Sequence, residues 1–367
     1  MVPQSNNSWV MVTSSALGSS SNSNSSISSI LSTTTIDNRP IFISDSMREK
    51  LEIVFFVVMS GGISFVGSFA NIINMVVFLK QGFSDTMNIS LFALALSDFG
   101  SLITLVWMAI CFVPDFRFHP NIPFETTQIQ YLSAGWPHML CARSGSLITA
   151  FITFERCICI ALPLRVKSII TPRRTIIVIA SIFGIMVVSV MPIYYGMQIG
   201  PTFLEDRNKT LLAIVYAKGG HEIESIGFAV GVVAQIGSFV LVVIFTVILL
   251  NSLVRKSRWR KTATSGDGTA SGSGAEKSNR DKRVMVMVVT ISGIFIACFM
   301  PSAINVVLII LWADYNIVGR LRNLFQVTGS ICNACESINC SINIIVYYKM
   351  SSKFRLTFRE MFHLKNE

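Results

Sequence analysis

The sequence predicts an all-α membrane protein: a bundle of seven transmembrane helices followed by a short amphipathic C-terminal helix. Two features of the sequence predict this fold class. Hydrophobic residues make up 51% of the 367 residues and charged residues only 14%, whereas about 25% of the residues in an average soluble domain are charged. Long apolar stretches also recur along the chain, and each has at least the ~20 residues that a helix needs to cross a bilayer.

Seven such stretches follow one another, separated by polar loops. They lack the alternation with a period of two that a membrane β-barrel requires. Because backbone groups inside lipid must be hydrogen-bonded within the protein, these stretches are expected to be helices. The predicted spans are residues 51–79, 87–113, 130–160, 175–198, 224–252, 283–312 and 322–348.

The N-terminal segment differs in kind from the rest of the chain. Residues 1–48 are rich in serine, asparagine and threonine, so they are expected to be disordered and extracellular. They contain no basic segment with a compact apolar stretch behind it, so the first span is expected to act as the insertion signal. Asn6, Asn24 and Asn208 lie in N-x-S/T motifs and are candidate glycosylation sites.

The distribution of lysine and arginine orients the bundle. With the N-terminus outside, the inner segments hold 20 of the 30 Lys and Arg residues and the outer segments hold 9, as the positive-inside rule requires. The formal charge of +10 therefore indicates topology and contact with anionic lipids, not nucleic-acid binding. We expect a multi-pass plasma-membrane protein whose transmembrane domain covers residues 49–349.

Two inner segments have distinctive compositions. Residues 256–281 include a Gly/Ser-rich stretch and are expected to form a flexible loop between spans five and six. Residues 350–367 are expected to form an amphipathic helix and a short inner tail, because Phe354 and Phe358 alternate with basic residues at helical spacing.

Short motifs recur in a fixed order along the spans. They are "FANIINMVVF", "LALSDF", "FERC", "CFMP" and "NIIVY". Taken together, they resemble the motifs of the rhodopsin-like (class A) G-protein-coupled receptors, over residues 50–362. The motifs of this sequence differ in places from the common form of the family. Those differences, together with the segment "ALPLRVKSI", resemble the molluscan-type branch of chemosensory and invertebrate neuropeptide-like receptors.

The resemblance implies a switch at the inner end of span three. Arg156 would pair in the resting state with Glu155 or with Asp281 of span six. Leu164 stands where members of the family contact the G protein. Tyr347 stands where they undergo the switch. The alternative for Arg156 is a side chain that extends to the membrane surface. The alternative for Leu164 is a side chain that faces lipid.

Span six carries the expected pivot of this switch. The resemblance implies that the span moves outward about Phe299 and Pro301, where Phe299 replaces the usual tryptophan. An outside ligand would drive this movement and open an inner cavity for the G protein.

Asp98 lies in the middle of span two. A carboxylate inside a bilayer costs several kcal/mol unless it is hydrated or paired, so it is a functional candidate by default. The resemblance implies that Asn71, Asn339 and Asn343 converge on Asp98, where relatives bind a sodium ion. Gly145 replaces the serine that often accompanies this ion, and a structural hydrogen-bond hub is the alternative.

Arg143 and Glu336 lie near the same depth inside the membrane. They could form an interhelical ion pair, or Arg143 could lie at the floor of a ligand pocket and receive an acidic group. His138 and Met139 are expected to line the same pocket. Because His138 stands where amine-binding relatives carry aspartate, a biogenic amine is not expected as the ligand.

The cysteines do not support the usual outer disulfide. Tyr131 stands where the family has a cysteine in span three, and the loop over residues 200–225 contains no cysteine. The sequence does not show what holds this loop instead. Cys332 and Cys335 lie within a span without a second ligand pair, so no metal site is expected.

The expected function is ligand-activated nucleotide exchange on a heterotrimeric G protein, with an environmental chemical cue or a small peptide as the ligand. The alternative is a seven-span transporter or channel in which Asp98, Arg143 and Glu336 form a charge relay. No H-E-x-x-H motif or catalytic pair of carboxylates is present, so an enzyme is not expected. Apart from the sodium ion, no cofactor is expected.

Overall fold

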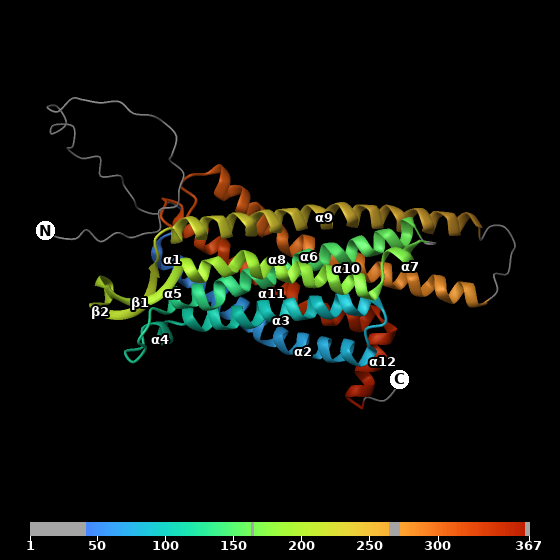
Figure 1. Ribbon diagram of the computed structural model, residues 1–367, viewed down its shortest axis with the longest axis horizontal. Helices are drawn as coiled ribbons and strands as arrows, with labels where there is room; N and C mark the ends of the chain where they lie inside the picture. The colour runs from blue at the N-terminus through green and yellow to red at the C-terminus, as the bar shows by residue number, and fades with distance from the viewer. Residues whose placement is uncertain (1–41, 163–164, 264–271, 364–367) are drawn as a thin grey trace, which may run out of the picture.

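The chain folds into long helices that run side by side (Figure 1). The computed structural model describes residues 42–162, 165–263 and 272–363, with side chains throughout these ranges except at Lys167, Asp206 and residues 256–282. The bulk of the disordered segment expected at residues 1–48 lies outside the described residues, as do the motifs at Asn6 and Asn24.

All seven predicted spans are helical. In chain order they are formed by α1 (Asp45–Glu52), the π-helical η1 (Ile53–Gly61) and α2 (Gly62–Gln81); α3 (Thr86–Phe112); α5 (Thr126–Gln130), the π-helical η2 (Tyr131–Gly135) and α6 (Trp136–Ala161); α8 (Pro172–Gly196); α9 (Gly220–Ala263); α10 (Gly272–Leu311); and α11 (Arg322–Met350). The shorter helices are α4 (Pro114–Arg117), α7 (Val166–Ile169) and the predicted amphipathic α12 (Ser352–Met361).

Six spans in the described residues are long and apolar enough to cross a membrane by composition alone. The seventh, α11, has 29 residues, which is more than the ~20 needed. Its buried residues include Ser330, Glu336, Ser337 and Asn343, so its polar side faces the interior of the bundle. The predicted seven-helix bundle is therefore confirmed.

Several helices begin at a polar cap. Asp85 caps α3 and Ser351 caps α12, and each accepts a hydrogen bond from a backbone N–H of the first turn. Thr171 caps α8 in the same way and is followed by Pro172 at the first helical position, where the missing N–H of proline costs nothing. These residues explain why three of the inner loops end where they do.

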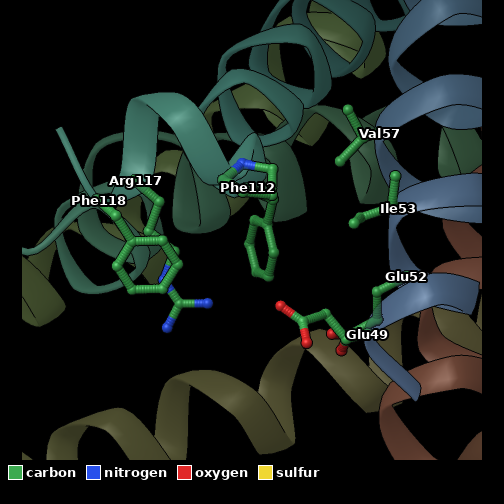
Figure 2. Close-up of a pocket in the computed structure, with 8 residues that line it drawn as sticks. Glu49, Glu52, Ile53, Val57, Phe112, Arg117 and Phe118 are labelled. Carbon is green, nitrogen blue, oxygen red and sulfur yellow. The ribbon is translucent and has the colours of Figure 1, made fainter. Parts of the chain in front are cut away.

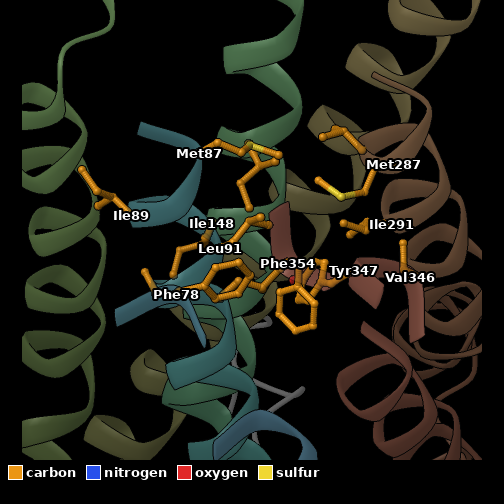
Figure 3. Packing of buried hydrophobic residues seen from close by; sticks show 14 of the residues in the cluster. Phe78, Met87, Ile89, Leu91, Ile148, Met287, Ile291, Val346, Tyr347 and Phe354 are labelled. Atoms are coloured by element: carbon orange, nitrogen blue, oxygen red, sulfur yellow. The ribbon is translucent and has the colours of Figure 1, made fainter. Parts of the chain in front are cut away.

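The largest apolar cluster lies in the inner half of the bundle (Figure 3). Phe354 of α12 is fully buried, with its ring centroid 5.5 Å from that of Phe78 on α2 and 5.6 Å from that of Tyr347 on α11. Ile148 of α6 and Ile291 of α10 belong to the same cluster. The amphipathic helix is thus anchored under the bundle by the buried Phe354, with Phe358 and Met361 packed against the same cluster.

Glycines allow close approach between helices. A Cβ at Gly67 would lie 1.9 Å from Ser341 Oγ, so α2 and α11 touch there through small residues. A Cβ at Gly227 would lie 2.6 Å from Ile193 Cδ1, and one at Gly231 would lie 3.3 Å from Met139 Sδ. The G-x-x-x-G pair of α9 is therefore used inside the bundle, against α8 and α6.

The loop between α8 and α9 contains a β-hairpin that the all-α prediction did not include. β1 (Met197–Leu204) pairs antiparallel with β2 (Lys209–Tyr216), in a register from Met197↔Tyr216 to Leu204↔Lys209. The turn contains Asn208, which is exposed and adopts a left-handed conformation with φ 48°. Its glycosylation stays a prediction.

The helices α9 and α10 extend into the segment that was expected to be a flexible loop. α9 continues to Ala263 and α10 begins at Gly272. In Figure 1 both run beyond the rest of the bundle, at the end opposite the hairpin. The prediction of a loop over residues 256–281 was therefore too long at both ends.

Candidate functional site

The inner end of α6 is tied to two neighbouring helices by Glu155. This fully buried carboxylate accepts hydrogen bonds from Ser90 Oγ of α3 at 3.0 Å and from Thr175 Oγ1 of α8 at 3.4 Å. Within the described side chains it forms no ion pair with Arg156 at 4.0 Å or less. Hydroxyl donors from two other helices bind the carboxylate, and Arg156 acts on it electrostatically from beyond 4.0 Å.

Arg156 is half-buried, and its Nε is enclosed without a hydrogen-bond partner in the described part of the chain. The side chain of Asp281 lies outside the described residues, as does Leu164, so their predicted roles stay predictions. One turn further out on α6, Thr153 Oγ1 lies 3.0 Å from Ser292 Oγ of α10, and both side chains are fully buried. This hydroxyl pair, which the sequence did not indicate, links α6 directly to α10.

The predicted pivot of α10 is an aromatic stack. The rings of Phe295 and Phe299 lie 4.3 Å apart at an interplanar angle of 24°. They pack with Ala150 of α6 and Val242 of α9, and Pro301 follows within the same helix. A proline inside a helix removes a backbone hydrogen bond and is a common site of bending.

Asp98 is buried and bound to one of the three predicted asparagines. Asn343 Nδ2 donates to Asp98 Oδ2 at 2.8 Å. Asn71 instead donates to the backbone carbonyl of Cys340 on α11 at 2.8 Å. Asn339 is half-buried, and no hydrogen bond from it to Asp98 is found among the described side chains. The polar site is thus an Asp98–Asn343 pair with Asn71 alongside.

The surroundings of Asp98 bear on the sodium ion. A Cβ at Gly145 would lie 3.6 Å from Asp98 Oδ1, so a serine here would bring its hydroxyl to the carboxylate, and glycine brings none. One carboxylate oxygen is already occupied by Asn343. The residues present therefore fit a sodium ion poorly, and we assign it no part in the function.

Glu336 is paired with His138 across the middle of the bundle. Its Oε1 lies 3.4 Å from His138 Nε2 and accepts a hydrogen bond from Ser101 Oγ at 3.0 Å. His138 Nδ1 lies 3.1 Å from the same hydroxyl. All three residues are buried. The interhelical ion pair of Arg143 with Glu336 is not formed, because His138 occupies this position.

Arg143 points toward α9. Its Nε donates to the backbone carbonyl of Gly231 at 3.2 Å, and Met139 lies beside it on α6. Across the described side chains, no carboxylate comes within 4.0 Å of its guanidinium. Asp98, Glu336 and Arg143 thus each contact a different partner, and no direct hydrogen bond joins these three side chains to one another among the described residues.

The comparison with known proteins decides the family. The sequence model of the family described as "7 transmembrane receptor (rhodopsin family)" matches residues 70–347 of this chain. The chain belongs to this receptor family. It is also similar to the growth hormone secretagogue receptor type 1 of Oryctolagus cuniculus, with 24% identity over 327 residues that cover 85% of this chain and 84% of the relative.

Family membership settles several predictions. The chain is a receptor and not an enzyme, and it is a multi-pass membrane protein. Membership of the rhodopsin-like family implies that the receptor couples to a G protein and has an extracellular ligand. The predicted resemblance to this family is confirmed, whereas its placement in a molluscan-type branch stays a prediction.

A carboxylate holds the outer loop of the receptor, for which the sequence offers no cysteine pair. Tyr131, at the position of the family's cysteine, donates its hydroxyl to Glu224 Oε1 at 2.7 Å, and Tyr216 of β2 donates to Glu224 Oε2 at 3.0 Å. Glu224 is 6% exposed. We call Tyr131, Glu224 and Tyr216 the loop tether, because they join span three, α9 and the hairpin without sulfur.

A second contact fixes the hairpin to the loop before α5. Arg207 Nη2 lies 2.9 Å from Glu125 Oε2, and the guanidinium groups of Arg207 and Arg117 lie 5.0 and 5.2 Å from the ring of Phe118. The backbone N–H of Glu125 donates to the carbonyl of Leu212 in β2 at 2.9 Å. The hairpin therefore has two anchors, both built from charged or polar side chains.

A crevice opens at the outer end of the receptor between the first helix and α3–α4 (Figure 2). The side chains of Glu49 and Arg117 point into it. Its lining residues are Glu49, Glu52, Ile53, Val57, Phe112, Pro114, Arg117 and Phe118. Two carboxylates, those of Glu49 and Glu52, and one guanidinium, that of Arg117, line it, so it carries both signs of charge.

Three features of the site were missed by sequence reasoning: the Thr153–Ser292 pair, the loop tether and the engagement of Glu336 by His138. The first two had no usable signal, because serine and threonine are common throughout the spans, and Tyr131 lies far along the chain from Tyr216 and Glu224, with Tyr216 in a loop of unknown path. The third did have one: His138 was already expected in the same pocket as Glu336.

Proposed function

We propose that this receptor spans the plasma membrane with its N-terminus outside, binds an extracellular ligand in the outer half of the bundle and activates a heterotrimeric G protein at its inner end. The inner ends of α6, α9 and α10 would form the G-protein surface. Outward movement of α10 would open it.

The observation that carries this proposal is how α6 and α10 meet: through a hydroxyl pair near Arg156 and through apolar packing of Phe295 and Phe299 against α6 further out. The Thr153–Ser292 hydroxyl pair joins the two helices close to Arg156. A hydrogen bond between neutral groups contributes only about 0.5–1.5 kcal/mol net. A ligand that prefers the open arrangement by a few kcal/mol could therefore shift the population toward it.

The ligand is proposed to be a chemical cue or a short peptide whose polar group reaches the middle of the bundle. Arg143 and the His138–Glu336 pair supply the polar groups there. The name of the rabbit relative, a secretagogue receptor, is compatible with either ligand class. No contact among the described residues favours the transporter alternative.

The test is nucleotide exchange on a purified heterotrimeric G protein, with full-length receptor in lipid nanodiscs. Candidate ligands come from a cell screen with a promiscuous G protein, covering amino acids, acidic odorants and short amidated peptides. Arg156→Ala is expected to abolish ligand-dependent exchange while surface expression is retained. The matched control is Arg320→Ala, at an exposed outer loop position. Ligand-dependent current or uptake without a G protein would contradict the proposal.

A further inference from the structure

Arg143 lies inside the helix bundle with no carboxylate within 4.0 Å among the described side chains, and Glu336 acts on it only from a greater distance. The arginine lies 13 residues before Arg156, which is about 20 Å along the helix, and so in the outer half of the bilayer. A charged group at such a depth is costly unless it is paired or hydrated. Arg143 therefore needs either a partner or access to water.

The nearby acids are already engaged. Glu336 is bound by His138 and Ser101, and Asp98 is bound by Asn343. In the residues that the structure describes, Arg143 uses only its Nε–H, toward the carbonyl of Gly231. An arginine has five N–H donors, so the two terminal nitrogens of the guanidinium remain available.

The neighbouring helices do not fully enclose Arg143. Its side chain is half-buried, not enclosed, and so is that of Met139. Gly231 presents no side chain to Arg143, since a Cβ there would lie 3.6 Å from Nε. Two turns further inward, Ala150 packs with Phe295 and Phe299 in a buried apolar cluster, which closes the inner side.

We propose that the ligand of this receptor carries an oxyanion, a carboxylate in the simplest case, and that the terminal nitrogens of Arg143 bind it between α6 and α9. This inference rests on the proposed function and adds the chemical class of the ligand. An arginine can bind a carboxylate through two parallel hydrogen bonds. Met139, beside the guanidinium, favours an apolar group next to the carboxylate.

The experiment uses benzoate and hexanoate as probes, with benzamide and hexanamide as neutral counterparts of the same shape. The readout is the thermal unfolding midpoint of the purified full-length receptor. At about 10 mM, a carboxylate that binds with a Kd of about 1 mM should raise the midpoint by about 2–4 °C. The amides should leave it unchanged.

Variants locate the binding. Arg143→Gln is expected to weaken carboxylate binding on the order of 10- to 100-fold, because bonds to charged groups are lost. Arg143→Lys should retain part of the affinity, since it keeps the charge but not the two-pronged geometry. Arg320→Gln, on the exposed outer loop, should bind as the wild type does.

Two results would overturn the inference: equal carboxylate shifts in the wild type and Arg143→Gln, or no shift of the wild type with either carboxylate. Nucleotide exchange on the same preparations keeps the two proposals apart. Lack of exchange by the wild type with every ligand would refute the proposed function. Ligand-dependent exchange combined with carboxylate binding that does not depend on Arg143 would refute this inference alone.

Discussion

The loop tether offers the sharpest test of how this receptor holds its outer surface together. Tyr131→Phe removes one hydroxyl, which lies 2.7 Å from Glu224 Oε1. The ring can remain in place, packed at 5.9 Å against Trp136. The change therefore deletes a hydrogen bond and leaves the packing intact.

The size of the effect follows from the burial of Glu224. A hydrogen bond to a charged group contributes about 1.5–3 kcal/mol to the free energy of unfolding. A loss of that size should lower the unfolding midpoint by about 3–6 °C in a chain of this length or somewhat shorter. Adding Tyr216→Phe should cost more than the sum of the single changes, because the buried carboxylate, 6% exposed, then loses both hydroxyls.

The contribution of Tyr216 also has a defined pH range. Burial, followed by the neighbouring Glu224 carboxylate, raises the pKa of Tyr216. A raised pKa means that the protonated hydroxyl is favoured in the folded state, so its contribution is fully present below the ordinary tyrosine pKa of about 10. It is lost only as the pH rises through the folded-state value. Because His221 stacks on Tyr216 and histidines ordinarily titrate below pH 8, the comparison is made above that range: the effect of Tyr216→Phe on the midpoint should be the same at about pH 8 and about pH 9.

The assay is thermal unfolding of purified full-length receptor, with Tyr195→Phe as the matched control. Tyr195 is 73% exposed, so the same chemical change there should leave the midpoint unaltered. The reasoning fails if Tyr131→Phe behaves like this control, or if the double variant loses no more than the single ones together.

Two further predictions concern the helix contacts. Ser292→Ala, which removes the partner of Thr153, should raise basal nucleotide exchange roughly 2- to 10-fold, because the lost bond contributes about 0.5–1.5 kcal/mol to the resting state. Unchanged basal exchange, equal to that of the exposed Ser181→Ala, would contradict it. Gly67→Ala should cost about 1–3 kcal/mol of stability through overpacking against α11, seen as a lower unfolding midpoint. Gly62→Ala, where a Cβ would meet nothing within 4 Å, serves as its control, and equal midpoints for the two would count against the close packing.

The positions of the helices could be predicted because the length of each apolar stretch can be read directly from the sequence. That Asp98 and Asn343 belong to one polar site was implied by the resemblance to the receptor family, together with Asn71 and Asn339, and the structure joins Asn343 to Asp98. The sequence could not predict that Glu155 would bond to Ser90 and Thr175 and not to the adjacent Arg156, because that choice depends on which helices lie beside α6. Contacts between hydroxyl groups of common residues cannot be recognised from the periodicity or the composition of a sequence.

The hairpin was missed for a different reason. The segment "KTLLAIVY" of β2 is rich in β-branched and apolar residues, which favour a strand, but it lies between long apolar spans that dominate the hydropathy. Its anchors, Glu125 and Glu224, come from separate segments. Only the folded chain shows that these carboxylates replace a covalent link.

The length of α9 has a mechanical consequence. Its 44 residues span about 66 Å, roughly twice the hydrocarbon thickness of about 30 Å, and α10 with 40 residues is nearly as long. The end of a helix that projects on the order of 30 Å beyond the bilayer moves by about 5 Å when the helix tilts by about 10°. A small tilt of either helix within the bilayer would therefore produce a larger displacement at its projecting end.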